Sequence, residues 1–270
     1  MSACAAYLRG MKYLAVLALL ASPAIAGPLD HDTTLTVLSG KQTSRGSVMA
    51  GLRIDMAEGW KTYWRAPGDA GIPPQFSWAG SKNVGSVAFQ WPVPQVFDQT
   101  GMRSIGYHGS VTIPVEVFPN DSGEIHLRGA IDIGVCEEIC IPVTLEFDAL
   151  LPRDAKRNPA ITAAKINRPM TAAEASVGDV TCAITPTEDG LQITTRTALA
   201  QRGAEAIVIE TADPAVWVSE PDVTRTATHI TATSDLVHVS GSSFALDRSG
   251  VRITVLGENR AIDIRGCKAP

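Results

Sequence analysis

Apolar residues stand at every second position over much of this chain, and that alternation limits the fold more than any other feature. The clearest runs cover residues 48–56, 111–117 and 125–135 in the first half, and 180–184, 191–193, 207–209 and 251–255 in the second. Neighbouring side chains of a β-strand point to opposite faces, so a period of two indicates strands with one buried face. The pattern predicts an all-β chain built from β-sandwiches.

A change of composition divides the strand pattern into two parts. Residues 153–175 are rich in Ala, Arg, Lys and Pro, and Asn158-Pro159 is typical of the start of a short helix, which we expect to run to Arg168. We therefore predict two β-sandwich domains, over residues 27–152 and 176–270, joined by a short, partly helical linker over 153–175. The first domain should contain about seven strands.

The first 26 residues have the layout of a secretory signal peptide. Arg9 and Lys12 form a basic lead, residues 13–21 are apolar, and Ala24-Ile25-Ala26 is a small-x-small cleavage site. The apolar run is shorter than the roughly 20 residues that a spanning helix needs. We expect residues 1–26 to be removed, the mature chain to be exported, and no membrane span to remain after cleavage.

The net charge and the cysteine content limit which classes of partner and which cellular compartment fit this chain. Loss of Arg9 and Lys12 takes the 23 basic residues to 21 against 28 acidic ones, a formal charge of −7. This balance argues against nucleic acid and against anionic membrane surfaces as partners. Cleavage also removes Cys4, and an even number of remaining cysteines in an exported chain indicates disulfide bonds.

Cys136 and Cys140 stand between two of the alternating apolar runs. On one straight strand, four steps of about 3.3 Å would place their α-carbons about 13 Å apart, too far for a disulfide. A hairpin with residues 137–139 as its loop brings the two cysteines opposite each other. In that register the apolar odd positions from Ile131 to Leu145 face inward, and both cysteines face away from the core.

A bond between these cysteines has two interpretations, a structural cross-link or a reactive disulfide. A bond that closes so short a loop constrains the unfolded chain little, so reactivity explains it more readily than stabilisation. Glu137 and Glu138 should disfavour a thiolate, so we expect no strongly acidic cysteine. Ile139 occupies a loop position where glycine is preferred, which predicts strain or a different loop shape.

Cys182 and Cys267 form the second candidate pair. Cys182 alternates with Val180 and Ile184 and should face the second core, while Cys267 lies near the C-terminus. A bond between them would close a loop of about 85 residues and contribute on the order of 4–5 kcal/mol in the chain-entropy model. We interpret this pair as a structural disulfide, with a second redox centre as the alternative.

Residues 59–74, which read GWKTYWRAPGDAGIPP, carry a resemblance to a known family. They are similar to the signature of the N-terminal periplasmic domain of the thiol:disulfide interchange protein DsbD, in the variant found in the copper-tolerance protein ScsB. Trp91-Pro92-Val93-Pro94, Gly106-Tyr107 and the segment from Cys136 to Pro142 follow in the order that the family shows. The resemblance is dense over residues 33–150 and loose over the remainder.

The resemblance implies an immunoglobulin-like fold and a periplasmic protein-disulfide reductase component that works by thiol–disulfide exchange, with no metal and no organic cofactor. A thioredoxin-like module would reduce the Cys136/Cys140 pair, which would then reduce periplasmic partner proteins. The family pattern makes Cys140 the sulfur that forms the mixed disulfide. It also implies an aromatic cap over the disulfide and further residues around it, namely Phe97 as the cap and Tyr63, Asp69 and Tyr107 beside it.

Two departures from the family modify this expectation. Full-length relatives continue into a multispanning membrane domain that supplies electrons, whereas this sequence shows none up to Pro270, so we expect a separate membrane protein as electron donor. Gln95 and Val96 replace the acidic residues that precede the cap phenylalanine in some relatives, which leaves Asp98 and Asp69 as the nearby acids.

Two other functions compete with electron relay. Two thiolates suit Cu(I), and the resemblance carries a copper link, so the same cysteines could serve copper binding or copper tolerance. Against this, no Met-rich or His-rich cluster lies near the cysteines in the sequence. In the third interpretation the chain is a non-catalytic binding module and both disulfides are structural.

Overall fold

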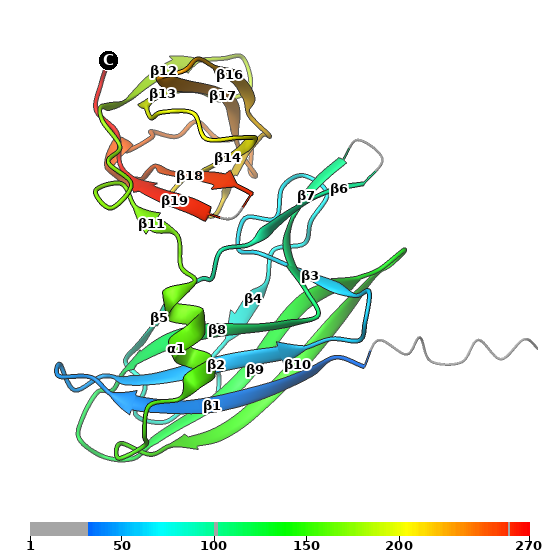
Figure 1. The fold of residues 1–270 in the computed structure, drawn as a ribbon, viewed down its shortest axis with the longest axis vertical. Helices are drawn as coiled ribbons and strands as arrows, with labels where there is room; N and C mark the ends of the chain where they lie inside the picture. Colours follow the sequence, from blue (N-terminus) through cyan, green and yellow to red (C-terminus); the bar gives the residue numbers. More distant parts are fainter. Residues whose placement is uncertain (1–31, 100–101, 259) are drawn as a thin grey trace, which may run out of the picture. The chain divides into compact units, whose positions relative to one another are not determined.

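The computed structural model describes residues 32–99, 102–258 and 260–270, so the expected signal peptide lies outside the described residues. The described chain is all-β apart from one α-helix and one short 3-10 helix, and its strands form two β-sandwiches (Figure 1). In these residues no helix has the length and apolar character needed to cross a membrane.

The first sandwich consists of a four-stranded and a six-stranded antiparallel sheet. In spatial order the first sheet contains β1 (Thr34–Gln42), β2 (Val48–Asp55), β8 (Ser110–Phe118) and β5 (Ser86–Phe89). The second contains β10 (Cys140–Leu151), β9 (Ile125–Cys136), β3 (Lys61–Tyr63), β7 (Met102–His108) and β6 (Gln95–Gln99), with β4 (Gln75–Ser77) also paired to β9.

The described part of the first sandwich thus has ten strands, where the sequence predicted about seven. The additional strands include β3 and β4, each three residues long, and β5, which has four. Segments this short do not repeat the alternation often enough to be recognised.

The core of the first sandwich is formed by the alternating residues from both sheets. Leu52 and Val115 of the four-stranded sheet and Leu127, Ile131 and Val135 of β9 have no exposed surface. Each such side chain contributes about 1.5–3 kcal/mol through its burial. The strands predicted over residues 48–56, 111–117 and 125–135 are present as β2, β8 and β9. In β2 and most of β8, however, successive residues are buried, so these two strands are covered on both faces rather than on one.

The helix predicted in the linker is present as α1 (Pro159–Ile166). The Asn158 side chain accepts hydrogen bonds from the backbone N–H groups of Ala160 and Ile161, and Pro159 occupies the first turn, where its missing N–H costs nothing. The helix ends at Ile166 rather than Arg168, because Asn167 leaves the helical conformation.

α1 packs on the outer face of the four-stranded sheet, across β2 and β8 (Figure 1). Ile161 is 3% exposed, and a Cβ added to Gly51 would lie 2.8 Å from its side chain. Because the glycine leaves room for the isoleucine, β2 is covered on both faces. This part of the linker therefore packs as a component of the first sandwich.

The second sandwich also contains two sheets. One contains β11 (Met170–Thr171), β19 (Arg260–Arg265), β18 (Arg252–Gly257) and β14 (Glu205–Glu210). The other contains β12 (Val180–Pro186), β13 (Leu191–Ala198), β17 (His229–His238) and β15 (Val216–Val218), with β16 (Asp222–Arg225) also paired to β17. The short helix η1 (Arg248–Gly250) precedes β18.

Candidate redox site

The strands β9 and β10 form one long hairpin whose register is the one predicted from the sequence. Counted from the loop, the opposed pairs are Cys136–Cys140, Val135–Ile141, Ile133–Val143 and Ile131–Leu145. Cys136 and Cys140 form a disulfide with their α-carbons 4.1 Å apart. Because side chains alternate between faces, the sulfurs lie on the face opposite to the core-facing Val135.

The hairpin loop closes without the left-handed residue that its length suggested. The Glu137 backbone N–H donates to the Ile139 carbonyl at 3.2 Å, and Ile139 does not have a positive φ. The predicted strain at Ile139 is therefore absent, and the loop has a different shape. The Glu137 carboxylate folds back onto Gly59, where φ is +85° and a Cβ would lie 2.6 Å from Oε1, so this contact requires glycine.

The two sulfurs differ sharply in their access to solvent. Cys136 is only 1% exposed, whereas Cys140, the first residue of β10, is exposed. Thiol–disulfide exchange needs an attacking thiolate to reach one sulfur, so access decides which sulfur is attacked. The geometry favours attack on Cys140, with Cys136 as the leaving sulfur.

Tyr63 brings a hydroxyl to both sulfurs. Its Oη lies 3.0 Å from Cys136 Sγ and 3.2 Å from Cys140 Sγ. Disulfide sulfurs carry no hydrogen, so the phenol must be the donor in these contacts. Burial raises the pKa of Tyr63, so the hydroxyl keeps its proton at neutral pH.

The segment that follows β3 covers this face of the hairpin beside the disulfide. The Tyr63 ring and Ile72 both contact Gly134, where a Cβ would lie 3.0 Å from each side chain. Tyr63 Oη also lies 3.4 Å from the Ala70 carbonyl oxygen. Asp69, predicted to surround the site, is exposed and is the neighbour of Ala70 in this segment.

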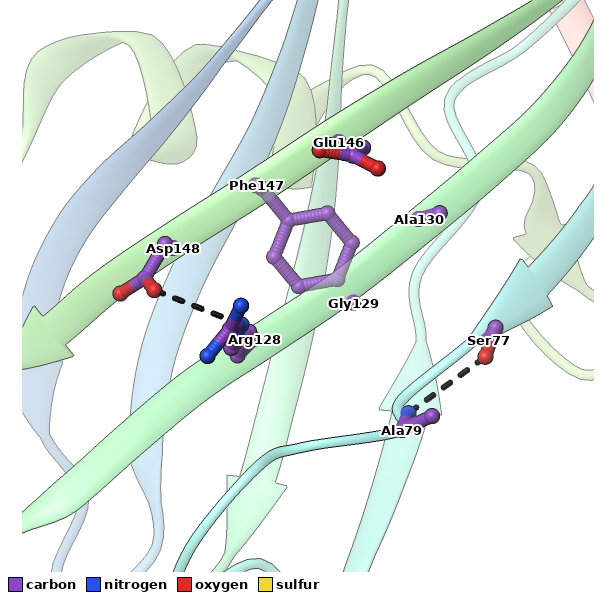
Figure 2. Close-up of a pocket in the computed structure, with 8 residues that line it drawn as sticks. All are labelled: Ser77, Ala79, Arg128, Gly129, Ala130, Glu146, Phe147 and Asp148. Atoms are coloured by element: carbon purple, nitrogen blue, oxygen red, sulfur yellow. Dashed lines mark hydrogen bonds and ion pairs between the residues drawn. The ribbon is translucent and has the colours of Figure 1, made fainter.

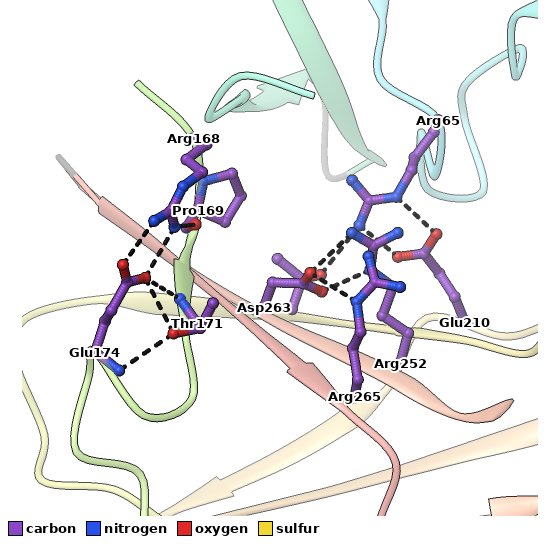
Figure 3. A network of polar contacts seen from close by, with 10 residues as sticks. Arg65, Arg168, Pro169, Thr171, Glu174, Glu210, Arg252, Asp263 and Arg265 are labelled. Carbon is purple, nitrogen blue, oxygen red and sulfur yellow. Dashed lines mark hydrogen bonds and ion pairs between the residues drawn. The ribbon is translucent and has the colours of Figure 1, made fainter. Parts of the chain in front are cut away.

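Arg65 lies two residues after β3, the strand that carries Tyr63. Its guanidinium lies 3.7 Å from the centre of the Trp64 ring and donates to both carboxylate oxygens of Glu210, at 3.0 and 2.9 Å (Figure 3). Burial lowers the pKa of Arg65, and the Glu210 charge opposes that shift. Two parallel bonds from a planar guanidinium restrict orientation more than a single bond does, so this pair helps to hold the Tyr63 backbone in place.

Phe97, predicted to cap the disulfide, lies on β6, at the opposite edge of the sheet from β10. Its ring packs edge-on against His108 at 4.7 Å between ring centres, and Lys61 Nζ lies 4.9 Å from the centre of the Phe97 ring. Both partners lie between Phe97 and the cysteine strands. The cap role of Phe97 remains a prediction.

Tyr107 lies on the core side of β7, away from the sulfurs. It belongs to the buried core of the first sandwich, and its hydroxyl donates to the Pro92 carbonyl at 2.9 Å. Burial raises the pKa of Tyr107 well above its ordinary value. The structure thus brings Tyr63 to the disulfide and places Tyr107 in the packing beneath the sheet.

Lys61 is a neighbour of the disulfide that sequence reasoning missed. It lies directly opposite Cys136 in the β3–β9 ladder and is almost wholly buried. A signal was present, because Lys61 precedes Tyr63 by two residues and must share its face of the strand. A lysine in an alternating pattern is ordinarily taken as solvent-facing, which concealed it.

Cys182 and Cys267 form the second disulfide, with α-carbons 5.7 Å apart. Cys182 has no exposed surface and lies within the core of the second sandwich. The bond joins β12 to the C-terminal segment after β19 and closes a loop 85 residues long. Its structural role remains a prediction.

A shallow pocket of about 450 Å³ lies further along the hairpin (Figure 2). It is lined by Ser77, Ala79, Arg128, Gly129, Ala130, Glu146, Phe147 and Asp148. Arg128 and Asp148 form an ion pair of 3.5 Å across the two strands. Neither cysteine lines this pocket.

The fold and the site together define a class, a β-sandwich protein with a disulfide at the end of a long hairpin and one accessible sulfur. Residues 34–152 match the family model described as "Thiol:disulfide interchange protein DsbD, N-terminal", and this part of the chain belongs to that family. Its disulfide at Cys136 and Cys140 therefore supports thiol–disulfide exchange as the general chemistry.

A solved structure has the same fold over most of the chain. The crystal structure of the N-terminal periplasmic domain of ScsB from Proteus mirabilis is similar with a TM-score of 0.65 and 23% sequence identity. The match covers 89% of this chain and 94% of that one. No protein of curated function matches the sequence.

Proposed function

We propose that this chain is a periplasmic protein-disulfide reductase component that relays electrons through Cys136 and Cys140. Its partners would be thioredoxin-like proteins, with a separate membrane protein as the source of electrons. The observation that carries the proposal is the asymmetry of the disulfide, in which Cys140 is exposed, Cys136 is buried, and the Tyr63 hydroxyl touches both sulfurs. The family match over residues 34–152 supports the chemistry, and the secretory pattern of the sequence over residues 1–26 supports the compartment.

In this proposal the two sulfurs have different tasks, which the exposure of Cys140 and the burial of Cys136 support. When a donor reduces the domain, the donor thiolate attacks Cys140 Sγ, a mixed disulfide forms, and the electron pair of the broken bond goes to Cys136 Sγ. A second donor thiolate then attacks the mixed disulfide, the donor leaves as a disulfide, and Cys140 is released as a thiolate. When the domain reduces a client, Cys140 attacks the client disulfide and Cys136 resolves the mixed disulfide.

Trapping of the mixed disulfide tests this assignment. A Cys136→Ser variant lacks the resolving thiol, so we expect it to accumulate a covalent complex with a thioredoxin-like protein, visible on non-reducing gels and identified by mass spectrometry. The matched control, Cys140→Ser, keeps only the buried thiol and should trap much less. The double variant Cys136→Ser/Cys140→Ser shows the background from other thiols.

Other outcomes of the same experiment would overturn the proposal. Trapping through Cys136 alone would reverse the roles of the two sulfurs. Absence of trapping in both single variants, together with tight Cu(I) binding by the reduced wild-type pair, would favour the copper function.

A further inference from the structure

Lys61 and Cys136 are direct neighbours on the redox face of the sheet. Lys61 lies opposite Cys136 in the β3–β9 ladder and opposite His108 in the β3–β7 ladder. Side chains that oppose each other in an antiparallel pair share one face, with Cβ atoms about 4.5–5.5 Å apart. The Lys61 side chain therefore emerges on the same face as the buried sulfur.

The Lys61 ammonium is enclosed by side chains from several strands. Lys61 is only 2% exposed, its Nζ donates to Ser104 Oγ at 3.3 Å, and it lies 4.9 Å from the centre of the Phe97 ring. His108 faces it from β7, and Tyr63 shares its own strand and face. Lysine is almost never buried without compensating partners. These contacts hold the ammonium over β7 and β6, on the sheet face that also carries Cys136.

We propose that Lys61 is a positioning residue for the exchange reaction, whose enclosed positive charge stabilises the thiolate that Cys136 becomes when the disulfide opens. This inference rests on the proposed function and assigns that function a residue which acts through Cys136. It also explains why a lysine is buried on the outer face of a sheet.

The charge of Lys61 matters at one defined point of the reaction. An incoming thiolate of a dithiol reductant forms a bond to Cys140 Sγ, and the Cys136–Cys140 bond breaks with its electron pair on Cys136 Sγ. The second thiolate of the reductant then completes its oxidation to a disulfide, so two electrons enter the domain. A positive charge near Cys136 lowers the free energy of the leaving thiolate, and a better leaving thiolate speeds exchange.

The carboxylates of the hairpin loop should destabilise the Cys136 thiolate, which Lys61 should stabilise, but solvent screens the carboxylates more strongly. Glu137 and Glu138 are exposed, so water and salt weaken their effect on Cys136. Lys61 acts from a buried site, where charges interact more strongly and salt screens them less. Burial lowers the pKa of Lys61, and a thiolate beside it would favour the protonated amine.

The first test measures the thiol pKa of Cys136 in a Cys140→Ser background, followed by the ultraviolet absorbance of the thiolate. We expect the pKa to lie below the ordinary value of about 8.5, despite Glu137 and Glu138. At pH values below the Cys136 pKa, adding Lys61→Met should decrease the fraction of Cys136 thiolate about tenfold. Lys61→Arg keeps the positive charge and should restore most of that fraction. A pKa at or above the ordinary value with Lys61 present would overturn the proposal without any need for the lysine variant to fold.

The second test uses the intact disulfide and glutathione as the redox buffer. At a pH above the Cys136 pKa of both proteins, where the reduced pair carries the Cys136 thiolate, Lys61→Met should decrease the equilibrium constant for reduction about tenfold, or about 30 mV for this two-electron couple. The effect should persist at high salt, whereas the opposite effect of Glu137→Gln/Glu138→Gln should shrink there. Equal constants for folded Lys61→Met and wild type would overturn the proposal. Neither test includes a protein partner, so failure of the trapping experiment is a separate result.

Discussion

The phenolic oxygen of Tyr63 lies 3.0 Å from Cys136 Sγ and 3.2 Å from Cys140 Sγ. One hydroxyl proton is therefore available to whichever sulfur carries negative charge after the bond opens. A neutral disulfide sulfur is a weak acceptor, and a thiolate is a strong one. The contact should therefore stabilise the reduced form more than the oxidised form.

Replacement of this hydroxyl should make the disulfide harder to reduce. A hydrogen bond to a charged group contributes about 1.5–3 kcal/mol, so Tyr63→Phe should lower the reduction potential by about 30–60 mV. Equilibration with glutathione measures this shift. Tyr107→Phe is the matched control, because its hydroxyl binds the Pro92 carbonyl in the core. Tyr107→Phe should lose about 1 kcal/mol of stability and leave the reduction potential unchanged. Equal reduction potentials for Tyr63→Phe and wild type would show that the contact of the Tyr63 hydroxyl with the sulfurs has no redox role.

Phe97 shields the outer face of the sheet through its contacts with His108 and Lys61. If it also caps the disulfide, Phe97→Ala should speed reduction by a small thiol such as dithiothreitol by about tenfold, because access limits attack. Global stability should change little, since Phe97 lies on an edge strand. Phe76→Ala is a suitable comparison, because Phe76 packs against Phe89 and Trp91. Phe76→Ala should decrease stability without accelerating reduction. An unchanged reduction rate for Phe97→Ala would show that Phe97 does not cap the disulfide.

The hairpin was predictable because two independent constraints agree on one register. The alternation from Ile131 to Leu145 fixes the inward face, and the disulfide distance requires a turn between Cys136 and Cys140. The segment after β3 that covers the hairpin beside the disulfide was not predictable in the same way. Its residues Ala70 and Ile72 belong to an irregular loop, in which apolar residues do not recur at a regular spacing. Lys61 was missed because β3 has only three residues and its lysine is buried on a face that alternation assigns to solvent.

The linker shows how a pattern can predict an element without its packing. Asn158-Pro159 was enough to predict the start of α1, because capping is a local property. That Ile161 packs against Gly51 depends on a pair of residues 110 positions apart, which no local rule supplies. The glycine is needed there for closeness of approach and not for a turn.

Glu174 should give the chain a contribution to stability that depends on pH (Figure 3). Hydrogen bonds from Arg168, and then from Thr171, lower the pKa of Glu174 from 4.5 to about 2. Because the folded pKa lies below the unfolded one, the contribution is complete above the unfolded pKa and is lost as the pH falls toward about 2. Arg168→Met should raise the Glu174 pKa in a carboxyl NMR titration. The denaturant midpoints of wild type and Arg168→Met should differ at neutral pH and converge below pH 2. A difference that stays constant with pH would mean that Arg168→Met changes stability through packing and not through the Glu174 charge.

The two disulfides should differ in their resistance to reduction. Cys136–Cys140 closes a loop of a few residues and has one exposed sulfur, whereas Cys182–Cys267 spans 85 residues and has one sulfur in the second core. Exposed bonds are the labile ones, and loss of the long-loop bond costs about 4–5 kcal/mol in the chain-entropy model. Mild dithiothreitol should therefore release the Cys136 and Cys140 thiols first, as measured by alkylation and peptide mass spectrometry. Cys182→Ser/Cys267→Ser should lower the denaturant midpoint, while Cys136→Ser/Cys140→Ser should change it little. Reduction of both bonds over the same range of dithiothreitol would contradict a division between a reactive and a structural disulfide.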